Sequence, residues 1–203
     1  MDELPEFHKD SLEALRQPLE DRCINVSRVA GNFTFPANIM LVGAANPCPC
    51  GFLLDKEKDC SCSPYQIQKY MKRISGPLLD RIDIQIEVTK PLYSELVGNE
   101  EGETSAEIKC RVEQARSIQR ERFGDLQVTS NGAMNARQVR QYCQMDQAGS
   151  KLLKDAFKSL GLSARSHDKI LKVARTIADL EGSPKISVHH LAEAVQYRGS
   201  KIS

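Results

Sequence analysis

The chain has 203 residues, which is enough for one large domain or two small ones. Apolar residues make up 40% and charged residues 27%, as in an ordinary globular protein, and 28 Lys and Arg against 27 Asp and Glu exclude a net charge of the kind that marks a nucleic-acid binder. The longest apolar stretches are too short to span a bilayer and no secretory signal opens the chain, so we expect a cytoplasmic protein without a membrane partner.

Residues 1–90 alternate helix and strand patterns and predict part of an α/β domain. In chain order the predicted elements are an amphipathic helix at 9–20, a β-hairpin at 23–38 with a turn at Gly31-Asn32, a buried strand at 39–45, a cysteine-rich loop at 48–62, a helix at 65–74 and a strand at 82–88. The strand at 39–45 is a continuous apolar run, which is typical of a central parallel strand that is covered on both faces.

A polar, acidic stretch at 91–104 predicts a linker, and residues 105–203 predict a helical domain without strands. Its helices are predicted at 105–123, 135–144, 146–160, 163–180 and 187–197. We expect Ser105 to cap the first of them and Gly161 to end the third. His189 and His190, at the start of the last one, are expected at the surface rather than on a metal.

Asp2 and Glu3 form an acid pair of the kind that P-loop ATPases place at the end of an apolar strand. There the Asp holds Mg²⁺ and the Glu polarises the attacking water, although two adjacent acids also suit a solvated chain end. Asn46 follows directly on the buried strand at 39–45. An amide in that place can orient a water or contact a γ-phosphate, and an ordinary Asn-Pro turn is the alternative.

Arg81 stands just before the predicted strand at 82–88. From there a guanidinium can project from the domain edge and reach the ATP of a neighbouring subunit, where it stabilises the charge of the transition state as an arginine finger does. The alternative is a surface ion pair with Asp80 or Asp83.

Two close pairs of cysteines flank a polar stretch: Cys48, Cys50, Cys60 and Cys62. Four thiolates can enclose a tetrahedral Zn²⁺, and a metal would replace the core that so short a loop lacks. One residue rather than the usual two separates the cysteines of each pair, and four reduced thiols or a disulfide are the alternatives. Zinc is favoured because no export signal precedes the cysteines. The scattered Cys23, Cys110 and Cys143 predict ordinary thiols.

Five segments carry a resemblance to a known family: DELPEF at 2–7, NPCPCG at 46–51, GPLLDRID at 76–83, and the helical stretches at 163–182 and 192–198. In this order they resemble the magnesium-chelatase subunit I-like AAA+ ATPases, and among these the bacterial ComM/YifB group. The resemblance covers nearly the whole chain. It implies the C-terminal half of an AAA+ P-loop core, with a parallel sheet, helices and a β-hairpin insert, followed by an all-α lid domain.

The resemblance implies a role for each candidate residue. The roles are Walker B acids for Asp2 and Glu3, sensor 1 for Asn46, arginine finger in trans for Arg81, and sensor 2 for Arg165 or, as a fallback, Arg175. The implied cofactors are ATP and Mg²⁺, which Asp2, Asn46 and the sensor 2 arginine would contact. The hairpin at 23–38 is implied to lie near the pore of a ring.

The family's phosphate-binding loop, Gly-x-x-x-x-Gly-Lys-Ser/Thr, does not occur in these residues. That loop supplies the backbone amides and the Lys that hold the phosphates, so we expect the chain by itself not to bind ATP. We interpret the sequence as an engineered or natural fragment of a longer protein, and we expect its incomplete sheet edge to favour self-association.

Three functional interpretations follow. For the parent protein the resemblance implies a ring-forming, hexameric ATPase that works on DNA, as in branch migration during natural transformation. For this chain alone the alternative is a zinc-stapled, non-enzymatic module that mediates subunit contacts. The third is the motor subunit of a metal chelatase, for which no residue of the sequence indicates a tetrapyrrole.

Overall fold

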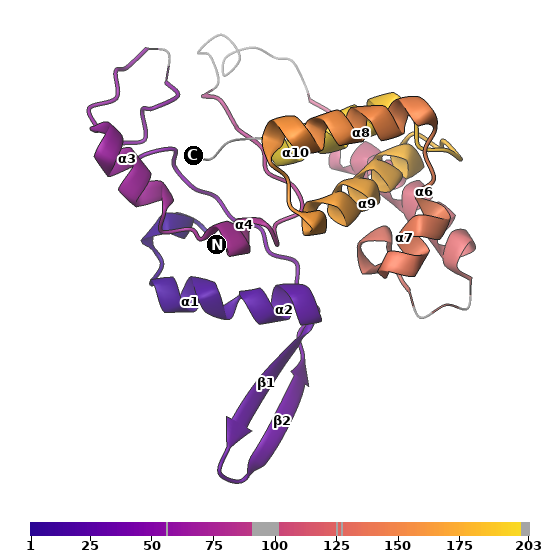
Figure 1. The fold of residues 1–203 in the computed structure, drawn as a ribbon, viewed down its shortest axis with the longest axis horizontal. Coiled ribbons are helices and arrows are strands. Elements are labelled where there is room, and N and C mark those ends of the chain that lie inside the picture. Colours follow the sequence, from indigo (N-terminus) through magenta and orange to yellow (C-terminus); the bar gives the residue numbers. More distant parts are fainter. Residues whose placement is uncertain (56, 91–101, 125, 127, 200–203) are drawn as a thin grey trace. The chain divides into compact units, whose positions relative to one another are not determined.

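The computed structural model describes residues 1–55, 57–90, 102–124, 126 and 128–199 (Figure 1). The chain divides into two compact units. Unit 1 contains Met1–Ile82 and Val88–Lys90, and unit 2 contains Asp83–Glu87 and the helical second half of the chain. Most of the linker predicted at 91–104 lies outside the described residues.

Unit 1 consists of short helices and one hairpin. Its elements are η1 (Leu4–Glu6), α1 (Lys9–Ala14), α2 (Arg16–Asp21), β1 (Cys23–Arg28), β2 (Gly31–Pro36), α3 (Pro64–Met71) and α4 (Gly76–Leu79). The single helix predicted at 9–20 is therefore two helices. Pro18 explains the division, because proline has no N–H for the carbonyl four residues earlier and its ring collides with that carbonyl; α1 ends at that residue, Ala14.

The predicted hairpin is confirmed, with its turn shifted by two residues. β1 and β2 pair antiparallel from Cys23↔Pro36 to Arg28↔Gly31, which leaves Val29 and Ala30 as the turn instead of Gly31-Asn32. Gly31 begins β2 at a φ of 139°, which a side chain rarely permits. Alternation along the strands places Ile24, Val26, Phe33 and Phe35 on one face of the hairpin.

The segments 39–45 and 82–88, both predicted as strands, are not strands among the described residues. Most of their apolar side chains are exposed, with Met40 at 89% and Val88 at 81%. A buried parallel strand needs paired strands along its edges and packed elements over both faces. The described part of unit 1 provides only part of this surrounding structure. The parallel sheet is thus left as a proposal.

Unit 1 has a small core below the acid pair. Leu4, Leu12, Ile74 and Leu78 pack together, and each is at most 5% exposed. The core joins the start of the chain to the segment before Arg81, which are far apart in sequence. It therefore holds both candidate site segments on one scaffold.

Unit 2 has only helices among its described elements. They are α6 (Ser105–Phe123), η2 (Asn131–Ala133), α7 (Ala136–Tyr142), α8 (Gln147–Leu160), α9 (Ala164–Leu180) and α10 (Val188–Gly199). Thr104, rather than Ser105, caps α6, since its side chain accepts from the Glu107 N–H and Glu107 reaches back to Thr104. Gly161 ends α8 in the left-handed conformation, as expected.

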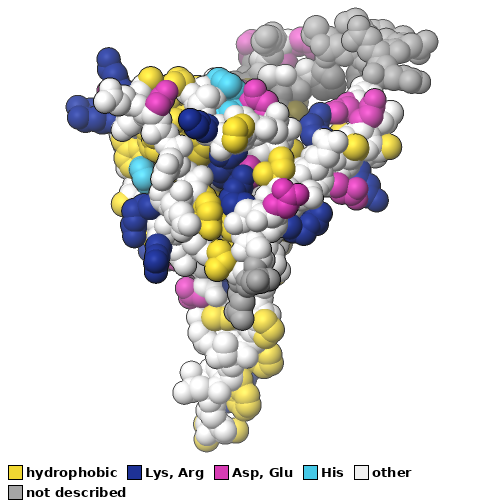
Figure 2. Space-filling model, turned by 90° about the vertical axis from the view of Figure 1, so that its right-hand side faces the viewer, with side chains coloured by type: hydrophobic (Ala, Val, Ile, Leu, Met, Phe, Trp, Pro, Cys, Tyr) yellow, Lys and Arg dark blue, Asp and Glu magenta, His cyan; other side chains and the backbone are white. Residues whose placement is uncertain are grey.

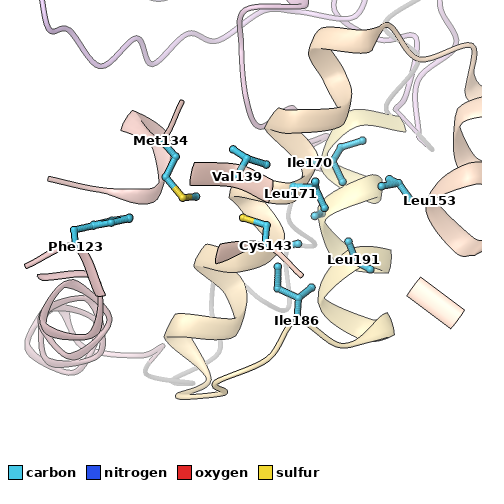
Figure 3. Close-up of a cluster of buried hydrophobic side chains, with 11 residues drawn as sticks. Phe123, Met134, Val139, Cys143, Leu153, Ile170, Leu171, Ile186 and Leu191 are labelled. Carbon is cyan, nitrogen blue, oxygen red and sulfur yellow. The ribbon is translucent and has the colours of Figure 1, made fainter. Parts of the chain in front are cut away.

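Helix α9 is the centre of unit 2, because α6, α7 and α10 all pack against it. Figure 3 shows its Ile170 and Leu171 among side chains from the surrounding elements. A polar network lies beside this apolar core. Asp179 of α9 accepts from Asn131 and forms ion pairs with Arg122 and Arg175.

Candidate functional site

The first four residues of the chain run beside residues 42–44. The Met1 amino group donates to the Val42 carbonyl at 2.8 Å, the Ala44 N–H donates to the Met1 carbonyl at 2.9 Å, and the Leu4 N–H donates to the Ala44 carbonyl at 2.9 Å. Met1 thus bonds to the two residues that flank Gly43, which is the hydrogen-bond pattern of two parallel segments. The pairing brings Asp2 and Glu3 to the same end as Asn46.

Glu3 has a strained backbone. Its φ of 49° and ψ of 49° lie in the left-handed region, which costs a residue with a side chain about 1–3 kcal/mol. Its N–H donates to Asp2 Oδ1 at 2.9 Å, and the buried Leu4 and Pro5 hold the chain on its other side. Asp2, Glu3 and Asn46 are all exposed, so their polar groups are accessible to a ligand.

Arg73 anchors the segment that follows the acid pair, and the sequence analysis missed it. From the end of α3 its Nη1 donates to the Pro5 carbonyl at 3.1 Å and to Glu6 Oε2 at 2.8 Å. Sixty-seven residues separate Arg73 from Glu6, and no local pattern marks such a pair. Arg73 therefore fixes the position of η1, and with it the exit of the chain from Glu3.

Arg81 is largely buried against the helices of unit 1. Its side chain is 9% exposed and forms an ion pair with Glu20 of α2. Two carbonyls accept its other protons, that of Arg16 at 3.1 Å and that of Pro77 at 2.8 Å.

The two candidate sensor 2 residues have different surroundings. Arg165 lies exposed in the first turn of α9. Arg175 is 2% exposed and donates to Asp179 and to the Pro184 carbonyl at 3.0 Å, and burial lowers its pKa. These contacts give Arg175 a role in the fold.

The structure brings the four clustered cysteines together. The sulfur of Cys48 lies 3.4 Å from that of Cys50 and 3.7 Å from that of Cys60, and 3.5 Å separates Cys50 from Cys60. Cys62 completes the group. With Zn–S bonds of about 2.3 Å, the sulfurs of a tetrahedral site are about 3.8 Å apart, so the cluster has the dimensions of a zinc site.

The protonation of the cluster also suits a cation. The Phe52 N–H donates to the Cys50 sulfur and, with hydrogen bonds from the other thiols, lowers the pKa of Cys50 to about 5. Cys60 accepts a backbone hydrogen bond from Cys62 that lowers its pKa, but burial and the nearby thiols outweigh this and raise it to about 12. A lowered pKa at one sulfur suits a metal ligand, and a divalent cation would displace the protons of the remaining thiols.

His190 is buried rather than exposed, which corrects the sequence-based expectation. Its Nδ1 accepts the Ser187 N–H at 3.0 Å, and its Nε2 contacts the Glu181 carboxylate. His189 Nε2 lies 2.9 Å from the same carboxylate. The three side chains place one ligand atom each within 4.8 Å of one another, as the ligands of a metal ion would.

Comparison with known proteins identifies the family. Residues 1–96 match the family described as magnesium chelatase, subunit ChlI, and residues 102–198 match magnesium chelatase, subunit ChlI C-terminal. The chain belongs to the magnesium chelatase family. Within this family it is ComM/YifB-like, in agreement with the resemblance that its sequence segments carry.

Several relatives in the magnesium chelatase family match nearly the whole chain. Competence protein ComM of Haemophilus influenzae is 43% identical over 199 residues, which are 98% of this chain and 38% of the relative. YifB of Escherichia coli is 40% identical over 201 residues, with the same coverage of both chains. An uncharacterized protein of Mycobacterium tuberculosis is 33% identical over 198 residues, 98% of this chain and 39% of its own.

This family member spans well under half the length of those relatives. Among the residues that the structure describes, no helix is both long and apolar enough to cross a membrane.

Proposed function

We propose that the chain forms the C-terminal part of the motor unit of an AAA+ ATPase. In this proposal the full-length protein assembles into a hexameric ring, hydrolyses ATP at the subunit interfaces and uses that energy to remodel DNA. The observation that carries the proposal is the pairing of residues 1–4 with 42–44, which presents Asp2, Glu3 and Asn46 at one end of two parallel segments. Ligands of open α/β sheets bind at that end. Membership of the magnesium chelatase family supports the same conclusion.

Each candidate residue has a chemical task in the proposal. Asp2 would hold Mg²⁺ and Glu3 would polarise the attacking water, with Asn46 orienting that water toward the γ-phosphate. Arg81 would act on the nucleotide of the neighbouring subunit and Arg165 on that of its own. ATP and Mg²⁺ supply the phosphoryl chemistry, and the phosphate-binding loop would come from the rest of the full-length protein.

The hairpin supports DNA as the partner. Residues 22–38 contain no acidic side chain, and Arg22 and Arg28 are their only charges. Phe33 and Phe35 are 47% and 54% exposed on its apolar face, and Figure 2 shows hydrophobic side chains along the hairpin at the bottom of the view. Exposed aromatic rings beside arginines form a stacking surface for the bases of single-stranded DNA. The name of the Haemophilus relative, a competence protein, favours the same partner.

Two substitutions in the full-length protein test the ATPase proposal. Glu3→Gln should lower ATP turnover at least 100-fold by removing the group that polarises water, and Arg81→Ala should lower it about 1,000-fold, the lower range for an arginine finger. Both variants should keep nucleotide affinity within about threefold, as measured by calorimetry. Asp10→Asn, an exposed acid on α1, is the charge-matched control. Full turnover in Glu3→Gln would contradict the proposal.

The DNA proposal is tested by replacing one hairpin ring. Phe33→Ala should weaken single-stranded DNA binding about 10-fold, because stacking of one base contributes about 1–3 kcal/mol. Asn32→Ala, on the opposite face of the same strand, should leave binding unchanged. Equal affinities of the two variants in a fluorescence anisotropy titration would exclude the hairpin as the contact.

The cysteine cluster supports a second proposal, that the loop at 48–62 binds one structural Zn²⁺. The four sulfurs would be the ligands, and the metal would stabilise a loop that packs few apolar residues. Elemental analysis of protein purified under reducing conditions should find one zinc per chain. Cys60→Ser should lose the metal and Cys110→Ser, on the exposed face of α6, should retain it; wild-type protein without zinc would refute the assignment.

If the full-length protein proves inactive, the zinc site leaves the alternative of a non-enzymatic module for subunit contacts. A chelatase motor is the remaining alternative. ATP turnover that depends on a tetrapyrrole-binding partner rather than on DNA would favour it.

A further inference from the structure

Two backbone carbonyls and one carboxylate are among the acceptors around the Arg81 guanidinium. Nε and Nη1 donate to the backbone carbonyls of Arg16 and Pro77, and Nη2 forms an ion pair with the carboxylate of Glu20. Both carbonyls belong to helices, α2 and α4, so their positions follow the fold. The carboxylate stands on a rotatable side chain, and of these three acceptors it is the one that another anion can replace.

The difference in solvent exposure between Arg81 and Glu20 indicates which side chain an incoming anion would meet. The Arg81 side chain is 9% exposed, whereas that of Glu20 is 37% exposed and lies on the solvent side of the pair. An approaching phosphate therefore meets Glu20 first. Carboxylate and phosphate oxygens present the same geometry to a guanidinium, and a triphosphate carries more negative charge.

We propose that Glu20 is a positioning residue that holds Arg81 until the nucleotide of a neighbouring subunit arrives, its carboxylate occupying the place of a phosphate oxygen. This inference rests on the proposed function, in which Arg81 is an arginine finger. The two carbonyls keep the guanidinium plane in a fixed orientation while Nη2 exchanges Glu20 for phosphate. The finger then needs only a movement of the Glu20 side chain, not a rearrangement of α4.

If Glu20 and phosphate compete for Arg81, removing the Glu20 charge should change ATP turnover in the opposite direction to removing Arg81. Removing Glu20's charge removes a competitor of the phosphate, so turnover at low ATP concentration should rise. If Glu20 served only to brace the fold, its loss would lower turnover and thermal stability together. The sign of the change in kcat/KM therefore separates the two roles.

The test uses the full-length protein with Glu20→Gln, which keeps an oxygen acceptor for Nη2 and removes the charge. We expect kcat/KM for ATP to rise about two- to fivefold, the range of a partly exposed ion pair, with the melting temperature unchanged. Asp21→Asn, an exposed acid next to it on α2, should leave kcat/KM unchanged. In the background of Arg81→Ala, Glu20→Gln should have no effect on turnover.

Three results would overturn the inference: a fall of kcat/KM in Glu20→Gln, no change, or an equal rise in Asp21→Asn. Should Glu20→Gln fail to fold, Glu20→Asp shortens the side chain by one methylene and should raise kcat/KM in the same direction, with unchanged or lower values refuting the role. Full turnover in Arg81→Ala would instead remove the finger assignment of the proposed function. Lost turnover in Arg81→Ala with an unaltered Glu20→Gln would remove only the role of Glu20.

Discussion

Asp179 is 1% exposed in unit 2 and faces two guanidinium groups, those of Arg122 and Arg175. Asn131 donates a further hydrogen bond at 2.7 Å. The carboxylate thus compensates a cation that burial would otherwise make costly, and it joins α6 and η2 to α9. Charge at this position therefore serves the packing of the helices.

Asp179→Asn should destabilise the chain by about 3–5 kcal/mol, because it leaves the buried Arg175 without a counter-charge. The free energy of unfolding in urea, followed by circular dichroism, measures the loss. Asp155→Asn, an exposed acid on α8, should change it by less than about 0.5 kcal/mol. A loss below 1 kcal/mol in Asp179→Asn would show that the network adds little to stability.

Glu181 should make the stability of unit 2 depend on pH in the acid range. Hydrogen bonds from His189 and His190 lower the pKa of Glu181 below its usual 4.5. A carboxyl group whose pKa is lower in the folded than in the unfolded protein stabilises the folded state at pH values above its unfolded pKa. This stabilisation is lost as the pH falls through the folded pKa, which for Glu181 lies below about 4.5. An NMR titration should find the Glu181 carboxyl titrating below 4.5 and closer to it in His189→Asn; equal midpoints would contradict this.

At the scale of elements, local sequence signals decide where helices begin and end. Pro18 separates α1 from α2, and Thr104 and Asp146 cap α6 and α8 with their own side chains. Gly161 ends α8 at a φ of 61°. Such signals act over three or four residues, and for that reason the predicted helix limits in unit 2 agree with the observed ones to within about two residues.

Gly161→Ala should destabilise unit 2 by about 1 kcal/mol, the cost of forcing a side chain into the left-handed conformation. A Cβ there would meet no atom within 4 Å, so the loss would come from the backbone alone. Gly132→Ala is the control in the same unit, because its Cβ would make only an ordinary contact at 3.9 Å with Ser130. Equal urea midpoints for the two variants would refute the expected strain.

At the scale of the whole molecule, the chain has the residues proposed to trigger hydrolysis but no loop to hold the phosphates. Exposed apolar side chains at Met40, Val42, Ile86 and Val88 lie on the two segments that were predicted as strands. Strands of this composition become buried when others pair with them. We therefore expect these segments to form strands only when further parts of an α/β core are present.

The chain by itself should show no binding of ATP at micromolar concentrations in calorimetry. The Gly-x-x-x-x-Gly-Lys-Ser/Thr loop would supply most of the phosphate contacts, and Asp2, Asn46 and Arg165 alone offer too few. A full-length family member, measured under the same conditions, is the positive control. Micromolar affinity in the isolated chain would mean that the phosphates bind elsewhere.

Short-range features of this protein followed from its residue order. The hairpin, the ends of the helices in unit 2 and the proximity of Cys48 to Cys50 depend on neighbours within a few positions, and the sequence predicts them except for the exact turn of the hairpin. The acid pair and Asn46 were likewise recognisable as candidates. That their segments run parallel and side by side, however, follows only from the hydrogen bonds between residues 1–4 and 42–44.

Ion pairing and burial in this protein depend on contacts between residues that are far apart in the sequence. Glu20 and Arg81 are 61 residues apart, and no pattern in the chain distinguishes this partner from the nearer Asp80 and Asp83. His190 was expected outside and lies inside, because the packing of α10 on α8 and α9 determines its burial. Local sequence sets the conformations that a segment prefers, whereas burial and ion pairing depend on which segments the fold brings together.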